Sequence, residues 1–179
     1  ALQVGHRVYV DDGAFGGRVE SVGIGADGRP HARIRVTGGP PGGGKVRAEK
    51  GINLHDTDVP VPALSADDLR SLDQVVALAD IVALSFVRTP HDVRMLQEEL
   101  VARGAGHLGL VLKIETVQAF RALPGLLRAA MATRSVGVMI ARGDLAVEAG
   151  YERLAELQEE ILWLCEAAHL PVIWATEVL

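Results

Sequence analysis

Hydrophobic and polar positions follow two different periods along this chain, and the period changes near residue 61. Before that point, short runs alternate residue by residue, which is typical of strands with one buried face. The runs expected as strands are 6–10, 18–22 and 32–36, and Asp11-Asp12-Gly13 marks a turn after the first of them. The pattern predicts a small β-rich domain over residues 1–60.

Beyond residue 61, apolar positions recur every three or four residues in some segments and run continuously in others. Helices are expected to begin after Ser65 and after Thr89 and to cover 117–130 and 151–168, and strands are expected at 80–87, 109–114, 135–141 and 171–175. Such strict alternation with short connections requires a parallel sheet. The predicted fold class is therefore α/β, a partial TIM (β/α)8 barrel over residues 61–179. The last strand is followed by no covering helix, so we expect a segment of a longer protein.

Composition narrows the choice of partners and compartment. The 179 residues are 49% hydrophobic and 23% charged, as in an ordinary globular protein, and the net charge of -5 argues against nucleic acid as a partner. No apolar run approaches the roughly 20 residues that span a bilayer, and the N-terminus lacks the apolar stretch of a signal peptide. The single cysteine, Cys165, excludes an internal disulfide and is expected in the core. We expect a cytoplasmic protein without a membrane partner.

Ionisable residues concentrate at the ends of two apolar runs. Lys113 and Glu115 close the first run and lie two positions apart, so on a strand they share one face. Asp144 follows the second run. The C-terminal ends of parallel barrel strands are where active sites form. A lysine with two carboxylates suits a divalent metal and an anionic substrate, which indicates phosphoryl or enolate chemistry.

Each of these motifs also has a simpler interpretation. Lys113 and Glu115 can be explained as a strand-end lysine and a helix-capping acid, and Gly143 and Asp144 as a turn whose aspartate caps the next helix. However, burying an unpaired lysine and glutamate is costly. Carboxylates on adjacent strands, about 5 Å apart, also repel unless a cation lies between them. The functional interpretation is therefore favoured.

The glycine-rich segment 39–45 has the spacing of a phosphate-binding loop up to its last position. There, Val46 replaces the Ser or Thr whose hydroxyl would reach magnesium, and no amphipathic helix pattern follows. Two prolines also occupy the segment. We therefore expect a flexible hairpin loop instead of a nucleotide site.

Taken in series, these segments resemble the pyruvate kinase family, whose barrel is interrupted after its third strand by a mobile β-domain. The matching motifs are VYVDDG (8–13), KGINL (50–54), VPALS (61–65), SFVR (85–88), KIE (113–115), ARGDL (141–145) and AT (175–176). The resemblance implies that residues 1–60 are an incomplete lid domain and that residues 61–179 hold about strands 4–7 of the barrel. It also implies a glycolytic parent enzyme that transfers a phosphoryl group from phosphoenolpyruvate to ADP, giving pyruvate and ATP.

The resemblance further implies roles for single residues. Glu115 and Asp144 would bind Mg²⁺ or Mn²⁺, Lys113 would neutralise the phosphoryl group in transfer, and Thr176 would position the enolate and its protonating water. Substrate-binding roles are implied for Ser85, Phe86, Ala141, Arg142, Gly143, Asp144 and Thr176. Lys50 and Asp12 of the lid would bind the nucleotide. The family's potassium ligands fall in barrel strands that this sequence lacks. The chain is therefore expected to be inactive alone. Its parent is expected to be a homo-oligomer.

Some positions depart from the family pattern. His55 stands where proline is usual, Ala146 where glycine is usual and Glu177 where glutamine is common, which suggests a divergent bacterial branch. A second hypothesis is a magnesium-dependent aldolase or citrate-lyase-type enzyme, because these phosphoenolpyruvate/pyruvate barrels also place Glu and Asp on successive strands. Lys113, Thr176 and the inserted β-module favour pyruvate kinase. A third hypothesis is a non-catalytic paralogue.

Overall fold

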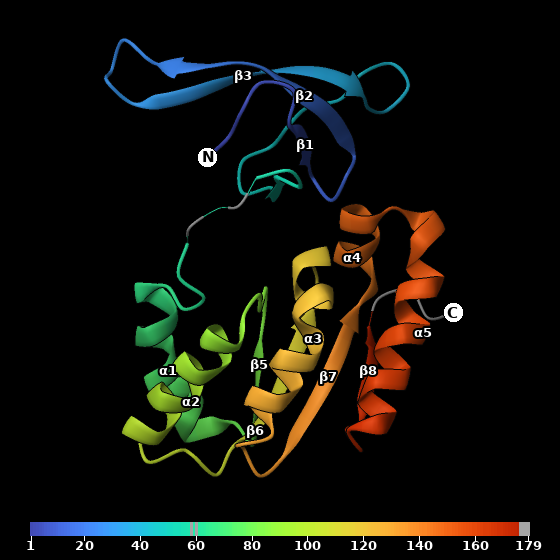
Figure 1. Cartoon of the computed structure of the whole chain (residues 1–179). Coiled ribbons are helices and arrows are strands. Elements are labelled where there is room, and N and C mark those ends of the chain that lie inside the picture. Colours follow the sequence, from blue (N-terminus) through green and yellow to red (C-terminus); the bar gives the residue numbers. More distant parts are fainter. Residues whose placement is uncertain (58, 60, 176–179) are drawn as a thin grey trace. The chain divides into compact units, whose positions relative to one another are not determined.

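The computed structural model describes residues 1–57, 59 and 61–175. The chain divides into two compact units, residues 1–60 and 61–179, which are described separately (Figure 1). In the part of the chain that is described, no helix combines the length and the apolar character needed to cross a membrane.

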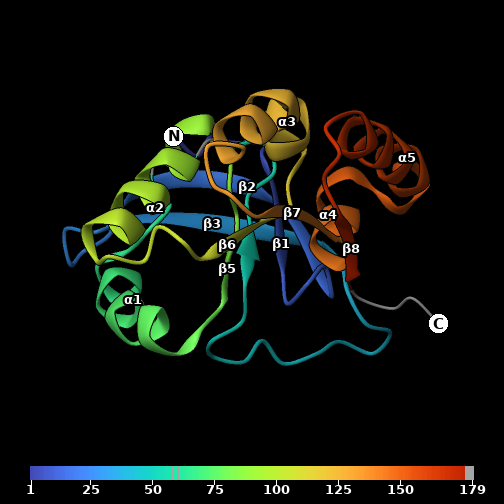
Figure 2. The same ribbon diagram turned by 90° about the horizontal axis from the view of Figure 1, so that it is seen from below.

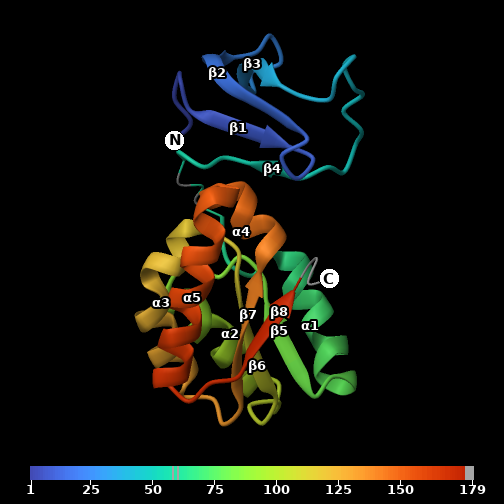
Figure 3. The ribbon, with the colours of Figure 1, turned by 90° about the vertical axis from the view of Figure 1, so that its right-hand side faces the viewer.

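The N-terminal unit is an antiparallel sheet. Its strands are β1 (Arg7–Val10), β2 (Phe15–Ile24), β3 (Pro30–Gly38) and β4 (Ile52–Asn53), in the order β3-β2-β1-β4. Figure 3 shows β4 along the edge formed by β1. Val8 and Val19 are buried in this small sheet. The three expected strands are present, while β4 was not predicted, because two residues carry no periodic pattern.

The glycine-rich segment is not a hairpin loop, so that prediction was wrong. It connects β3 to β4, and these strands lie at opposite edges of the sheet. Gly42 and Gly43 both have a φ of +83°. Phe15 packs against the segment so closely that a Cβ at Gly44 would lie 2.7 Å from its Cζ. The element that follows is a strand, whereas a phosphate-binding loop needs a helix there.

The C-terminal unit alternates helices with a parallel sheet, as predicted. Its elements are α1 (Ala66–Leu78), β5 (Ile81–Leu84), α2 (Pro90–Ala102), β6 (Gly109–Ile114), α3 (Val117–Ala130), β7 (Val136–Ala141), α4 (Arg142–Ala149), α5 (Tyr151–Ala167) and β8 (Val172–Ala175). The four strands pair in sequence order, β5-β6-β7-β8. Seen from below, α2, α3 and α5 lie along one side of this sheet (Figure 2).

Polar side chains start α1, α2 and α3 of this unit. Ser65 and Asp68 form a capping box at α1, and Thr89 and Asp92 form another at α2, where Pro90 occupies the first turn. Thr116 accepts a hydrogen bond from the amide of Ala119 at the start of α3. These caps satisfy backbone donors that a helix start leaves unpaired.

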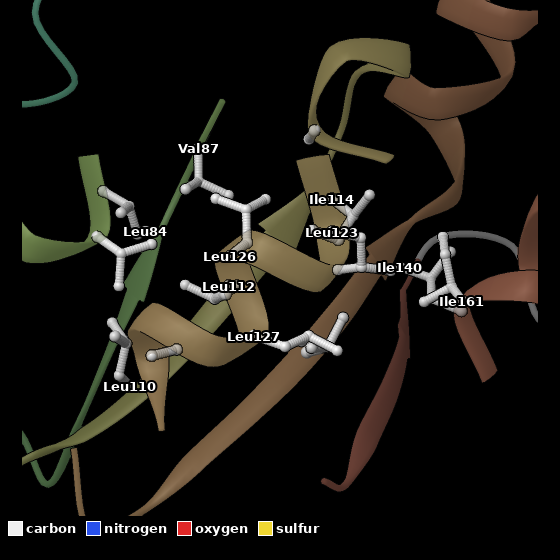
Figure 4. Close-up of a cluster of buried hydrophobic side chains, with 14 of the residues drawn as sticks. Leu84, Val87, Leu110, Leu112, Ile114, Leu123, Leu126, Leu127, Ile140 and Ile161 are labelled. Atoms are coloured by element: carbon white, nitrogen blue, oxygen red, sulfur yellow. The ribbon is translucent and has the colours of Figure 1, made fainter. Parts of the chain in front are cut away.

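The hydrophobic core lies between the sheet and its helices. Leu110, Leu112 and Ile114 of β6 pack toward Leu123, Leu126 and Leu127 of α3, with Ile140 of β7 and Ile161 of α5 beside them (Figure 4). Cys165 is buried in the same cluster, as expected, and burial raises the pKa of its thiol to about 11. The alternate residues of β6, including Lys113, therefore face the opposite side of the sheet.

Two segments differ from the sequence prediction. The fourth-strand segment forms a strand only over β5, and residues 85 and 86 follow it as a turn. Ile81 is 60% exposed, because it alternates with Val82 and Leu84, which pair with the core-facing residues of β6. The segment after β7 is a helix, α4, so Gly143 and Asp144 do not form the turn of the simpler interpretation. Gly150, with a φ of +89°, ends α4 and precedes α5. The predicted helix 151–168 is confirmed as α5, whereas α4 was not predicted, because only α5 carries several turns of regular spacing.

Candidate functional site at the ends of β5, β6 and β7

Lys113 and Glu115 are in direct contact at the C-terminal end of β6. The Lys113 Nζ lies 2.7 Å from Glu115 Oε1 and 3.0 Å from Ser85 Oγ, which follows β5. The Glu115 side chain is 2% exposed, whereas that of Lys113 is 26% exposed. Lys113 and Glu115 therefore share one face, as their spacing predicts. They form an ion pair in which the carboxylate is buried and the ammonium is accessible to solvent.

Phe86 supplies a second donor to the same carboxylate. Its backbone N–H donates to Glu115 Oε2, so both oxygens of Glu115 accept bonds from neighbouring groups. Phe86 has a φ of 49°, in the left-handed region, which costs an L-residue roughly 1–2 kcal/mol. Strain of this kind is characteristic of functional sites.

These contacts compensate for the burial of the Glu115 charge. A carboxylate taken out of water is costly unless a counter-ion and hydrogen bonds replace its hydration. Here the ammonium of Lys113 and the amide of Phe86 provide that replacement. The simpler interpretation of Glu115 as a helix cap is wrong, because the cap of α3 is Thr116.

Asp144 follows the neighbouring strand. The β6–β7 register pairs Ile114 with Ile140, so Glu115 and Ala141 come next on adjacent strands. Helix α4 begins at once, as Figure 3 shows at the end of β7. Asp144 is the acid of the first turn of α4, and the residue that precedes this helix is Ala141, so Asp144 is not its cap. Ala141 makes no side-chain cap bond, and such a helix start suits an anion.

Arg142 is directed toward β8. Its Cζ lies 6.0 Å from the ring centroid of Trp174, within the range of a cation–π interaction. Trp174 is paired with Ile140 in the β7–β8 register. The sequence did not single out Trp174, because only this register brings it beside the start of α4. Thr176, the remaining barrel residue with an implied role, lies outside the described residues.

In the N-terminal unit, Lys50 pairs with Asp11. The Lys50 Nζ lies 2.7 Å from Asp11 Oδ1, and the hydrogen bond and charge of Asp11 raise the pKa of Lys50, with a smaller charge effect from Asp12. Asp11 and Asp12 have φ values of 59° and 52°, which suit the tight turn between β1 and β2. The resemblance assigned Asp12 a role beside Lys50, whereas the residue that contacts Lys50 is Asp11 of the same turn.

His55 follows β4 and is partly buried. Its ring stacks on Tyr9 with the centroids 4.6 Å apart. Burial lowers the pKa of His55, and the charge of Arg7 lowers it further, while Asp56 opposes them. Arg7 in turn binds Asp56, with Nη2 2.7 Å from Oδ1, and holds the pKa of that carboxyl well below its usual range.

The N-terminal unit is therefore expected to lose stability as the pH falls below about 6.5, the usual histidine pKa. Below that pH, the unfolded chain protonates His55 more readily than the folded one, so the stability present above it declines toward the lowered pKa. The loss linked to Asp56 begins only below about pH 4. Limited proteolysis of this unit between about pH 5 and about pH 8 measures the effect.

The variant His55→Phe should flatten this pH dependence, because it retains the stacked ring and removes the titrating group. The same change at His31, an exposed residue of β3, should leave the dependence as it is. A profile unchanged by His55→Phe would show that other groups control the acid sensitivity.

The carboxylates near β6 and β7 fit a hard divalent cation in chemical type. Mg²⁺ is commonly bound by one or two carboxylates that act together with substrate oxygens and water. Glu115 and Asp144 supply two such groups. Among the described residues, no cluster of three or more His, Cys, Asp or Glu side chains could hold a metal by itself. In residue type, Glu115 and Asp144 match the pair of carboxylates that Mg²⁺ combines with substrate oxygens and water.

Comparison with known proteins gives consistent matches over the whole chain. Residues 1–179 match the family model described as "Pyruvate kinase, barrel domain". Pyruvate kinase from Methylorubrum extorquens is 34% identical over 180 residues, covering 100% of this chain and 34% of the relative. The Mycoplasma pneumoniae pyruvate kinase is 31% identical over 179 residues, covering 99% and 33%.

Human pyruvate kinase PKLR is 33% identical over 179 residues, covering 99% of this chain and 29% of the relative. The chain spans about one third of the length of the curated relatives that it matches. The resemblance inferred from the motifs at the strand ends is thus confirmed. From its first residue to its last, the chain belongs to the pyruvate kinase family.

Proposed function

We propose that this chain is part of a cytoplasmic, homo-oligomeric enzyme that transfers a phosphoryl group from phosphoenolpyruvate to ADP, giving pyruvate and ATP. The observation that carries the proposal is the contact of Lys113 with the buried Glu115 at the end of β6. Residues 61–179 would provide about strands 4–7 of a TIM barrel, and residues 1–60 part of its lid. The other strands, and the potassium ligands, would come from the rest of the polypeptide.

Lys113 is suited to neutralise a phosphoryl group. Glu115 and Ser85 hold its ammonium, yet its side chain remains partly exposed. Phosphoryl transfer depends chiefly on positioning and on neutralising charge, and does not need a covalent nucleophile. Lys113 is therefore proposed to stabilise the phosphoryl group between donor and acceptor. Thr176 is proposed to position the enolate and the water that protonates it.

The start of α4 is suited to the substrate carboxylate. The amides of Gly143 and Asp144 lie in its first turn, where helix N–H groups favour an anion. Ser85, Phe86, Ala141 and Arg142 belong to the same strand ends and are proposed to border the substrate. Glu115 and Asp144 would hold Mg²⁺ or Mn²⁺, which would supply positive charge to the substrate oxygens.

Lys50 is proposed to bind the nucleotide together with Asp12, with Asp11 holding its ammonium. Lys50→Met should raise the KM for ADP about 10-fold to 100-fold, because a hydrogen bond to a charged group contributes about 1.5–3 kcal/mol. Steady-state kinetics with varied ADP measure this effect. Lys45→Met, on the exposed glycine-rich segment, is the matched control and should leave the KM unchanged. An equal effect of both variants would contradict the assignment.

The deciding experiment is a coupled assay on the full-length protein that contains this chain. Formation of pyruvate and ATP from phosphoenolpyruvate and ADP, dependent on Mg²⁺, would support the proposal. Cleavage of a hydroxy-keto acid without ATP formation would indicate the aldolase alternative. Mn²⁺ binding without either reaction would indicate a non-catalytic paralogue. Residues 1–179 alone are expected to give no turnover.

A further inference from the structure

We propose that Phe86 is a positioning residue, whose left-handed backbone holds its amide N–H on Glu115. This fixes the carboxylate oxygen that Lys113 does not engage. The inference rests on the proposed function, because the orientation of Glu115 affects turnover only if Glu115 binds the metal. It assigns to the backbone of Phe86 a role distinct from substrate contact.

The conformation of Phe86 is not explained by packing of its ring. The residue is 49% exposed, and a φ of 49° is one that L-residues other than glycine rarely adopt. Its amide, in contrast, has a specific partner in Glu115 Oε2. A hydrogen bond to a buried, charged acceptor is stronger than one between neutral groups. The bond to Glu115 is therefore the interaction that keeps Phe86 in this conformation.

Two consecutive residues after β5 hold the two members of the ion pair. The Ser85 hydroxyl lies 3.0 Å from the Lys113 ammonium, and the amide of Phe86 binds the Glu115 carboxylate. The turn at the end of β5 thus orients both functional groups of β6. The hydrogen-bond partners of a metal-binding side chain fix its orientation, and loss of these partners commonly weakens metal binding. If residue 86 relaxed to a negative φ while the chain on either side stayed in place, the peptide plane between residues 85 and 86 would rotate, and Glu115 would lose one of its two fixed contacts.

The test compares Phe86→Gly with Phe86→Val in the full-length protein. Both variants lack the ring and retain the N–H, but glycine adopts a positive φ without strain, whereas β-branched valine tolerates it less than phenylalanine does. Deuterium exchange of the residue 86 amide reports the hydrogen bond, and the Kd for Mn²⁺, measured by electron paramagnetic resonance, reports the carboxylate. Phe86→Gly should keep the amide protected and the Kd within about 2-fold, while Phe86→Val should speed exchange and weaken Mn²⁺ binding about 10-fold.

His169 provides a matched control, because it is an exposed residue with a φ of 55° in the turn after α5. His169→Val should be less stable than His169→Gly, and both should bind Mn²⁺ like the unmodified protein. Equal Mn²⁺ affinity and equal amide exchange in the two Phe86 variants would overturn the inference. So would an equal loss of affinity in both, since the ring would then be the important group.

A further variant, Glu115→Ala, separates this inference from the proposed function. If Glu115→Ala leaves the Kd for Mn²⁺ unchanged, the metal role of Glu115 is wrong, and amide exchange alone decides the role of Phe86. A protected amide in Phe86→Gly and a rapidly exchanging one in Phe86→Val would then still support the positioning of Glu115. Equal exchange rates in the two variants would overturn it.

Discussion

Replacing Lys113 with methionine in the full-length protein is expected to lower kcat for pyruvate formation about 10³-fold. Methionine keeps much of the side-chain volume but removes the ammonium that faces the proposed phosphoryl position. A 10³-fold loss corresponds to about 4 kcal/mol of transition-state stabilisation. The affinity for Mn²⁺ should stay the same or increase, because the variant also removes a positive charge 2.7 Å from Glu115. Coupled turnover and Mn²⁺ titration measure the two effects separately.

The two measurements together make this prediction specific. Lys45→Met is again the matched control, since Lys45 lies on an exposed segment and should affect neither quantity. A kcat that is unchanged by Lys113→Met would refute the role of Lys113. A simultaneous loss of turnover and of Mn²⁺ binding would indicate that Lys113 maintains the site's structure, because Glu115 would then have lost its orientation along with its counter-ion.

The contact between Lys113 and Glu115 could be predicted because local rules determine it. The apolar run 109–114 is continuous, so it forms a strand buried against helices, and residues two apart on a strand share a face. The helices α1, α2 and α3 were also predictable, since their capping residues and their apolar spacing agree. In these segments, propensity, periodicity and packing favour the same structure.

Other features depend on contacts between residues that are distant in sequence. The strand β4 exists only because Ile52 and Asn53 pair with β1, more than forty residues earlier. The conformation of Phe86 depends on a hydrogen bond to Glu115, 29 residues later, and nothing in the local sequence requires a positive φ at a phenylalanine. Likewise, the choice between Asp11 and Asp12 as the partner of Lys50 follows from the geometry of the turn.

Glu115→Gln should have the opposite effect on the metal from Lys113→Met. Glutamine is nearly isosteric, and its side-chain oxygen can still accept the N–H of Phe86, so the turn after β5 should persist. It lacks the negative charge that attracts a cation. Loss of a group behind a ligand commonly weakens metal binding 10-fold to 100-fold, so loss of the ligand charge itself should raise the Kd for Mn²⁺ at least about 100-fold. Turnover at fixed Mg²⁺ should fall accordingly.

The control for this variant is Glu156→Gln on α5, where the carboxylate is 58% exposed and lies 3.6 Å from Arg153. It removes one negative charge from the same unit and should leave both Mn²⁺ binding and turnover unchanged, because an exposed ion pair of this kind contributes little. Undiminished Mn²⁺ affinity in Glu115→Gln would contradict the metal role of Glu115. Lys113→Met would then preserve or increase the affinity for Mn²⁺, and Glu115→Gln would decrease it. The two members of one ion pair would therefore have separate functions, Lys113 toward the phosphoryl group and Glu115 toward the metal.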